Sequence, residues 1–128
     1  MTIAPKQGLV KDSRGAVQIG MGAIAGYFSP DTDRLTAATD ELIQDLRSKN
    51  PDLRLVRGQR HSVTVDGSNG ETVLLVGTSP MGDQRELDSL LTVTRPNGLF
   101  YLILICPEND YNSVRPTFVE MQHSVRFR

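Results

Sequence analysis

The segment Leu99–Ile105 is apolar at every position, and this run constrains the fold more than any other feature of the chain. Successive side chains of a strand point to opposite faces of its sheet, so a strand without a polar side must be covered on both. The segment Val73–Val76 has the same character. We therefore expect central strands buried on two faces, which one helix cannot cover.

Two turn sequences predict that these central strands are antiparallel. Arg60–Asp66 has alternating polarity and continues, after a short glycine-containing connection, into the apolar segment Glu71–Gly77. Leu87–Arg95 and Leu99–Cys106 are separated by Pro96-Asn97-Gly98, in which asparagine and glycine adopt positive φ at little cost. Each pair of segments is predicted to form a β-hairpin.

The N-terminal quarter of the chain contains a second alternating pattern. From Ala16 to Phe28 apolar residues fall on alternate positions, which predicts one long strand with a buried face. The glycines on its other side indicate a bend, a bulge or a close neighbour. A turn at Asp12–Gly15 is expected to connect this strand to a short one near Leu9.

A helix is predicted after that strand. Ser29-Pro30-Asp31-Thr32 has the hydroxyl, proline and acidic residues that favour a helix N-terminus. Apolar residues then recur at helical spacing to about Lys49. Asn50-Pro51 should end the helix, because asparagine tolerates the left-handed cap and proline cannot continue the helix.

The second helical cover is predicted near the C-terminus. The segment Ser113–Ser124 has apolar residues on one face, and Asp110 or Asn112 is expected to cap it. Val125 and Phe127 are expected to add a short terminal strand. The predicted fold is α+β, an antiparallel β-sheet with helices on both faces, which is an α/β/α sandwich.

The length and charge of the chain exclude several classes of protein. Its 128 residues suit a single domain covering 1–128. A formal net charge of −1, with arginines scattered among acids, provides no basic surface for nucleic acid. No apolar run approaches the roughly 20 residues of a membrane-spanning helix. Ile3 lies in what reads as an extended segment already under way, so we expect the chain to be part of a longer protein.

Catalytic and metal-binding motifs are weak throughout. Gly20–Ala25 fits a dinucleotide-binding pattern, but it lies inside a predicted strand rather than between a strand and a helix. Cys106 and His123 could act as nucleophile and base, although a cysteine that ends an apolar strand is usually buried and inert. His61 is expected to be a solvated surface residue. We predict no catalytic residue, no cofactor and no metal site, and retain a Cys106–His123 hydrolase as a hypothesis.

The connection from Thr78 to Glu86 is longer and more polar than a hairpin needs. Loops carry function more often than the strands that they join. Its candidate partner-contact residues are Met81, Asp83, Arg85 and Glu86. A solvated connection without a function is the alternative.

The sequence also resembles the C-terminal domain of bacterial zinc-dependent proteases whose catalytic domain carries an H-E-x-x-H motif. The resemblance covers nearly the whole chain and rests on turn and core positions. These are Ile3-Ala4-Pro5, Val17, Gly22, Leu42, Leu46, Asn50-Pro51, Gly77-Thr78-Ser79-Pro80, Asp88–Thr94, Gly98, Tyr101, Pro107–Tyr111, Phe118, Met121 and Ser124-Val125. The order of helix and strands is also similar to the fold of PsbP-type photosystem proteins and the Ran-binding Mog family.

These resemblances imply a non-catalytic accessory domain that packs on, or recruits partners for, a neighbouring protease-like domain. They also imply a parent protein of the periplasm or cell envelope. The zinc ligands of the protease family have no counterpart in this sequence, so its catalysis is not carried over. The alternative is a stand-alone ligand-binding or assembly module of PsbP/Mog-like fold.

Overall fold

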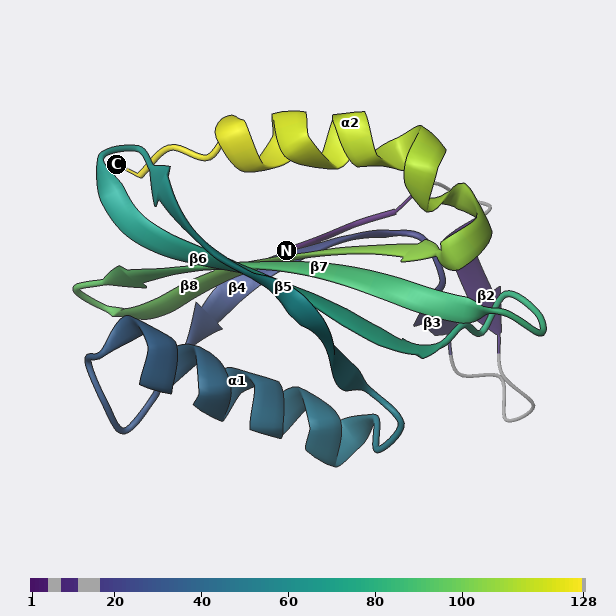
Figure 1. Ribbon diagram of the computed structural model, residues 1–128, viewed down its shortest axis with the longest axis horizontal. Helices are drawn as coiled ribbons and strands as arrows, with labels where there is room; N and C mark the ends of the chain where they lie inside the picture. Colours follow the sequence, from purple (N-terminus) through teal and green to yellow (C-terminus); the bar gives the residue numbers. More distant parts are fainter. Residues whose placement is uncertain (5–7, 12–16, 128) are drawn as a thin grey trace.

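The computed structural model describes residues 1–4, 8–11 and 17–127, which form two α-helices and two β-sheets (Figure 1). The helices are α1 (Leu35–Lys49) and α2 (Tyr111–His123), and a 3-10 turn, η2 (Glu108–Asp110), precedes α2. The strands are β1 (Thr2–Ile3), β2 (Leu9–Lys11), β3 (Val17–Ile19), β4 (Gly22–Phe28), β5 (Arg54–Val65), β6 (Ser68–Thr78), β7 (Arg85–Arg95) and β8 (Gly98–Pro107). No described helix is long and apolar enough to cross a membrane.

The main sheet has six strands in the order β1-β4-β8-β7-β6-β5, and every neighbouring pair is antiparallel. The predicted α+β class with an antiparallel sheet is therefore confirmed. Both predicted hairpins form, and the β5–β6 turn uses Asp66 and Gly67 at φ of 49° and 77°. β5 begins at Arg54, earlier than predicted, because a bulge at Gly58, with φ of 76°, lets the longer strand stay paired.

The prediction of one long strand from Ala16 to Phe28 is wrong. The chain bends at Gly20 and Met21, whose backbone N–H groups both donate to the carbonyl of Gly8, at 2.7 and 3.2 Å. Before the bend, β3 pairs with β2 in a separate two-stranded sheet, whereas β4 enters the main sheet after it. Alternation alone could not reveal that break, because both strands keep the period of two. Residues 12–16, with the predicted turn, lie outside the described residues.

Helix α1 begins later than predicted. Its N-cap is Arg34, which makes no side-chain capping bond, and Ser29-Pro30 belong to the preceding loop. The Thr32 hydroxyl accepts a hydrogen bond from the N–H of Arg34 at 3.2 Å and so stabilises the loop instead. The helix ends before Asn50 as predicted, but Asn50 has φ of −136° and is not in the left-handed region. Pro51 explains the stop.

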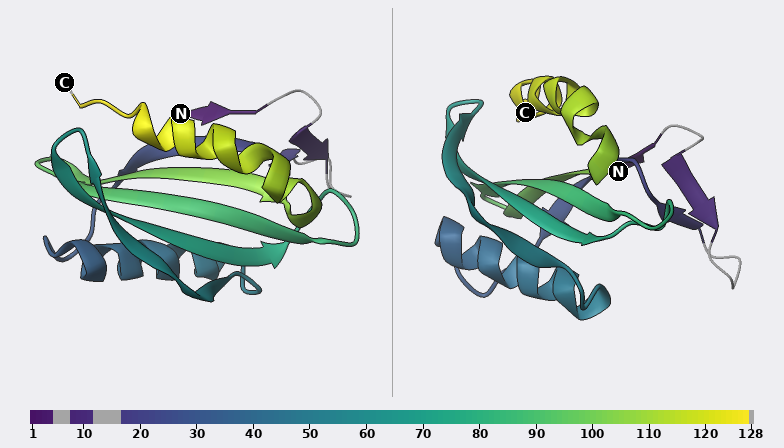
Figure 2. Two further views of the ribbon diagram at one scale, coloured as in Figure 1. Left: turned by 45° about the horizontal axis from the view of Figure 1, so that its top comes forward. Right: turned by 45° about the vertical axis from the view of Figure 1, so that its right-hand side comes forward.

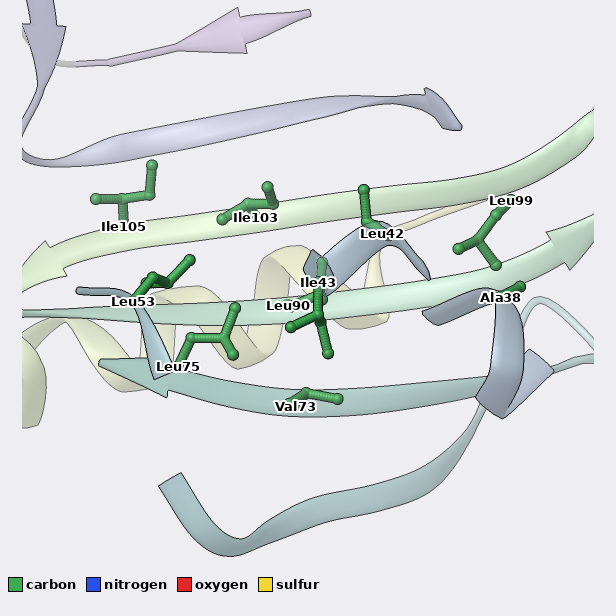
Figure 3. Close-up of a cluster of buried hydrophobic side chains, with 10 residues drawn as sticks. All are labelled: Ala38, Leu42, Ile43, Leu53, Val73, Leu75, Leu90, Leu99, Ile103 and Ile105. Carbon is green, nitrogen blue, oxygen red and sulfur yellow. The ribbon is translucent and has the colours of Figure 1, made fainter. Parts of the chain in front are cut away.

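Buried side chains form two clusters, one on each face of the sheet. Figure 3 shows the first, in which Leu42 and Ile43 of α1 pack over Leu90 of β7. The second cluster includes Leu91 of β7 and Phe118 of α2. Consecutive residues of β7 therefore bury opposite faces, as its apolar sequence requires.

The two helices cover the sheet unequally. α1 buries four residues, whereas α2 buries only Phe118. Figures 1 and 2 show α2 on the side of the sheet away from α1, above the middle strands. Its main contacts are with β7, β8 and η2. A complete helical layer over each face, as the sandwich prediction implied, does not form, and the side of the sheet near β4 is left open beside α2.

The end of the chain also differs from the prediction. Val125 and Phe127 do not form a strand. The Phe127 N–H instead donates to Oδ2 of Asp66 at 2.7 Å, which ties this segment to the β5–β6 turn. Asp110, one of the two predicted caps, is the N-cap residue of α2, but its side chain makes no capping hydrogen bond; Asn112 lies inside the helix.

Candidate binding groove

A groove lies between α2 and the outer strands of the sheet. Its floor is made by the alternate residues Ala23 and Ala25 of β4 and by Leu102 of β8, which face the second core cluster. The alanine side chains are too short to fill the space that α2, packed over β7 and β8, leaves beside it. The cavity has a volume of about 500 Å³, within the range of small-molecule sites.

The segment after α2 forms one wall of this cavity. Phe127 meets Phe100 of β8 edge to face, with ring centroids 5.2 Å apart, and Phe100 meets Tyr27 of β4 at 5.7 Å. The guanidinium of Arg95 lies 4.1 Å from the centre of the Phe127 ring. These contacts explain why the chain end packs here without strand pairing, because aromatic and cation–π contacts replace backbone hydrogen bonds.

The opposite wall is the short edge strand β1. The Ala25 N–H donates to the Met1 carbonyl at 2.6 Å, and Ile3 pairs with Ala23. Ile3 is 56% exposed although its side chain is large and apolar. Gly22 is required at this contact, because a Cβ there would stand 2.6 Å from the Ile3 carbonyl oxygen.

A second, smaller pocket of about 200 Å³ continues the first toward the start of α2. The two pockets share Ile3, Ala23 and Met121 in their linings. We refer to them together as the α2–β4 groove. Apart from Thr117, the side chains that line the second pocket are apolar.

Another cavity of about 520 Å³ is also lined by Arg95 and lies beside the β4–α1 loop. Asp31, Thr32 and Asp33 line it, so it is more polar than the α2–β4 groove. Binding sites for small molecules are mostly apolar with a few polar groups, and the α2–β4 groove fits that description better.

The predicted contact residues of the β6–β7 loop do not line the groove. Met81 is half-buried, with its side chain at Gly20, and Asp83 is exposed. Arg85 forms an ion pair with Glu108, and Glu86 is half-buried on β7. The role of this loop in partner contact stays a prediction.

The sequence analysis missed a pair of carboxyl groups on β7. Asp88 is only 7% exposed and lies opposite Leu75 and Ile105, two residues of the first core cluster. Glu86 precedes it by two positions and so shares its face. Burial raises the pKa of Glu86 to about 9, with a further contribution from its hydrogen bond to Asp88. Burial also raises the pKa of Asp88, to about 6.

At neutral pH these raised pKa values favour a pair in which Glu86 keeps its proton and donates a hydrogen bond to Asp88. The Oδ1 atom of Asp88 has no hydrogen-bond partner in the described residues. A signal was available in the sequence: Asp88 falls on the same side of the strand as Leu90, at a position where the pattern calls for an apolar residue.

The structure contradicts the Cys106–His123 hydrolase. Cys106 has no exposed surface, and burial, with nearby carboxylates, raises the pKa of its thiol to about 12. It lies before α2, whereas His123 ends that helix, which is roughly 18 Å long at 1.5 Å per residue. His61 is exposed, as predicted. Among the described residues, no group of three potential metal ligands comes together.

The dinucleotide pattern at Gly20–Ala25 also lacks the required setting. These residues form the bend before β4 and its first half, and no helix follows them directly. A phosphate-binding turn needs a helix N-terminus at that point, so the prediction against nucleotide binding there agrees with the fold.

The sequence matches no protein-family model and no curated protein. The solved structures that are similar in fold include the following two. One is PA94 of Pseudomonas aeruginosa, a protein of unknown function, with a TM-score of 0.59 and 10% identity over 94% of this chain and 96% of that chain. The other is the solution structure of the cyanobacterial PsbP protein CyanoP of Synechocystis, with a TM-score of 0.55 and 17% identity over 92% and 75%. At these identities the likeness shows a PsbP-like fold alone, as the fold resemblance implied.

Proposed function

We propose that this chain is a non-catalytic binding domain and that the α2–β4 groove is its binding site. The observation that carries the proposal is the groove itself, an apolar cavity with a small set of polar groups at one end. Such a cavity is the usual form of a ligand site. The buried, unreactive thiol of Cys106 and the separation of His123 from it support a binding role over hydrolysis.

A neutral hydrophobic dye tests this function. N-phenyl-1-naphthylamine should gain fluorescence on binding to the chain, and saturating dye should raise the melting temperature, because a ligand that binds only the folded state stabilises it. Ala25→Phe places a ring on the floor of the groove and should abolish both effects. Ser62→Phe, at an exposed position of β5, is the matched control and should leave both effects intact.

A dye that binds Ala25→Phe and the unsubstituted chain equally would place its site outside the groove and reject the proposal. The melting temperature of each dye-free variant shows whether the substitution itself unfolds the domain. A dye signal that is absent from the unsubstituted chain would also reject the proposal.

A second candidate function is the accessory role beside an H-E-x-x-H metallopeptidase domain, in the cell envelope. Three large apolar side chains favour it: Ile3, Leu9 and Val17 are 56%, 45% and 58% exposed. They belong to β1, β2 and β3. Figures 1 and 2 show β2 and β3 at the end of the molecule where α2 begins. Exposed apolar residues of this kind favour contact with a neighbouring domain.

Co-expression tests this candidate. The domain and the catalytic domain of such a protease, made as separate chains, should co-elute in gel filtration, and Val17→Asp should separate them. Glu120→Gln, an exposed change on α2, should not. Independent elution of the two unsubstituted chains at micromolar concentration would reject the accessory role.

A further inference from the structure

The α2–β4 groove changes character along its length. Near the start of α2 it is lined by Met21, Val114 and Phe118, all apolar. Near the end of the chain it is lined by Arg95 and Arg126 together with other polar residues. The described lining residues of the two pockets include no aspartate or glutamate. The groove is therefore apolar at one end and positively charged at the other.

The two arginines retain hydrogen-bonding capacity. Arg95 donates through Nη1 to Oγ of Ser68 at 3.0 Å while its guanidinium lies over Phe127. Arg126 donates through Nη1 to the carbonyls of His123 and Val125, at 2.8 and 2.7 Å. A guanidinium has five N–H donors, so the remaining donors of each are free of these bonds.

Neither arginine pairs with a carboxylate within residues 1–4, 8–11 and 17–127, whereas Arg60 and Arg85 do. Two positive charges with no ion-pair partner within the described residues, at the mouth of an apolar cavity, complement a negative group on a ligand. The contact with Phe127 also holds the Arg95 guanidinium in place before a ligand arrives, which lowers the entropy cost of binding.

We propose that the groove binds a single-chain amphiphile with a carboxylate head, in other words a free fatty-acid-like anion. The head would bind Arg95 and Arg126, and the tail would run over Ala25 and Ala23 toward Val114. A guanidinium binds a carboxylate through two parallel hydrogen bonds, which favours this head group. The proposal rests on the proposed function of the groove and adds the chemical class of its ligand.

Three probes of equal chain length separate the head-group contribution from that of the tail: decanoate, 1-decanol and decyltrimethylammonium, each below its micelle concentration. Their affinities are measured by displacement of N-phenyl-1-naphthylamine and by the rise in melting temperature. Decanoate should bind at least about tenfold more tightly than decanol, as a charge-assisted hydrogen bond implies, and decyltrimethylammonium should bind more weakly than either. Raising the salt concentration should weaken decanoate alone.

Substitutions locate the head group. Arg95→Met and Arg126→Met should each reduce the preference for decanoate over decanol without abolishing it, and the double variant should abolish it. Arg95→Lys should retain part of the preference, because the charge stays but the two-bond geometry is lost. Arg47→Met, an exposed change on α1, is the matched control and should retain all of it. Melting temperatures of the free variants report whether each one folds.

The outcomes distinguish this inference from the function on which it rests. Equal binding of decanoate and decanol would overturn the choice of an anionic head while leaving the groove as a binding site. Failure of the dye and all three probes would overturn both. A preference for decanoate that survives in the double variant would overturn the assignment of the head group. Binding to vesicles containing anionic lipid, without binding of free decanoate, would overturn the inference in favour of a membrane surface.

Discussion

The carboxyl pair on β7 predicts that this domain becomes less stable as the pH rises from 5 to 8. The pKa of Glu86 is raised from 4.5 to about 9 on folding, so the folded chain holds a proton that the unfolded chain has released in this range. The free energy of unfolding then falls with pH, because the state that binds more protons is favoured at low pH. This contribution is complete below about pH 4.5 and is lost progressively toward the folded-state pKa.

The magnitude follows from that shift. Between the unfolded-state and folded-state pKa values of Glu86, each pH unit lowers the free energy of unfolding by up to about 1.4 kcal/mol, so three units would lower it by about 4 kcal/mol for a fully buried group. Glu86 is only partly buried, and solvent screening reduces the expected loss to about 2 kcal/mol. For a domain of this size that loss lowers the melting temperature by roughly 8 °C. Asp88, whose pKa is raised to about 6, adds to the fall in the free energy of unfolding near pH 5.

Glu86→Gln removes the titration but keeps a neutral side chain that can donate to Asp88. The variant should equal the unsubstituted chain at pH 5 and exceed it by about 2 kcal/mol at pH 8. Urea unfolding followed by far-ultraviolet circular dichroism measures this, since the chain contains no tryptophan. Glu120→Gln, on the exposed side of α2, should follow the unsubstituted chain. A stability that is constant or rises from pH 5 to pH 8 would refute the reasoning.

Three further predictions concern contacts that hold the fold together. Thr39→Val should lower the free energy of unfolding in urea by about 1–2 kcal/mol, because it removes the bond from Thr39 to the Leu35 carbonyl at 2.8 Å and leaves the Thr92 hydroxyl, 2.7 Å from Thr39, with only an acceptor at 3.5 Å. Thr92→Val should cost less, because Thr39 keeps its bond to Leu35; equal costs would contradict this. Arg60→Met should cost about 2–3 kcal/mol because it leaves Glu71, 7% exposed, without its ion pair, and adding Glu71→Gln should recover part of the loss. Cys106 should resist iodoacetamide until the chain unfolds globally, as followed by mass spectrometry; rapid labelling of the native chain would contradict its burial.

The central architecture could be predicted from local patterns. The apolar run at Leu99–Ile105 required a strand covered on two faces, and Asn97-Gly98 required a hairpin turn beside it. These inferences succeeded because strand periodicity and turn conformation depend on neighbouring residues in the chain. The same holds for the end of α1 at Pro51, since proline lacks the N–H that the helix needs.

The groove and the carboxyl pair could not be predicted in this way. Ala23 and Ala25 read as ordinary small residues of a strand, and they become the floor of a cavity because α2 packs mainly over β7 and β8, to one side of β4. Phe127 was expected to belong to a strand, but its ring contacts Phe100 and the Arg95 guanidinium and forms part of one wall of the groove. Each of these outcomes depends on contacts between segments far apart in the chain.

What the sequence by itself determined is thus the antiparallel sheet, its hairpins and the need for two covered faces, because these follow from the alternation of side chains along a strand. Only the tertiary structure decided where the helices leave the sheet uncovered and which charged side chains line the α2–β4 groove. The physical reason is that a helix of 13 residues covers only part of a six-stranded sheet. Its position over β7 and β8 leaves the α2–β4 groove open beside it.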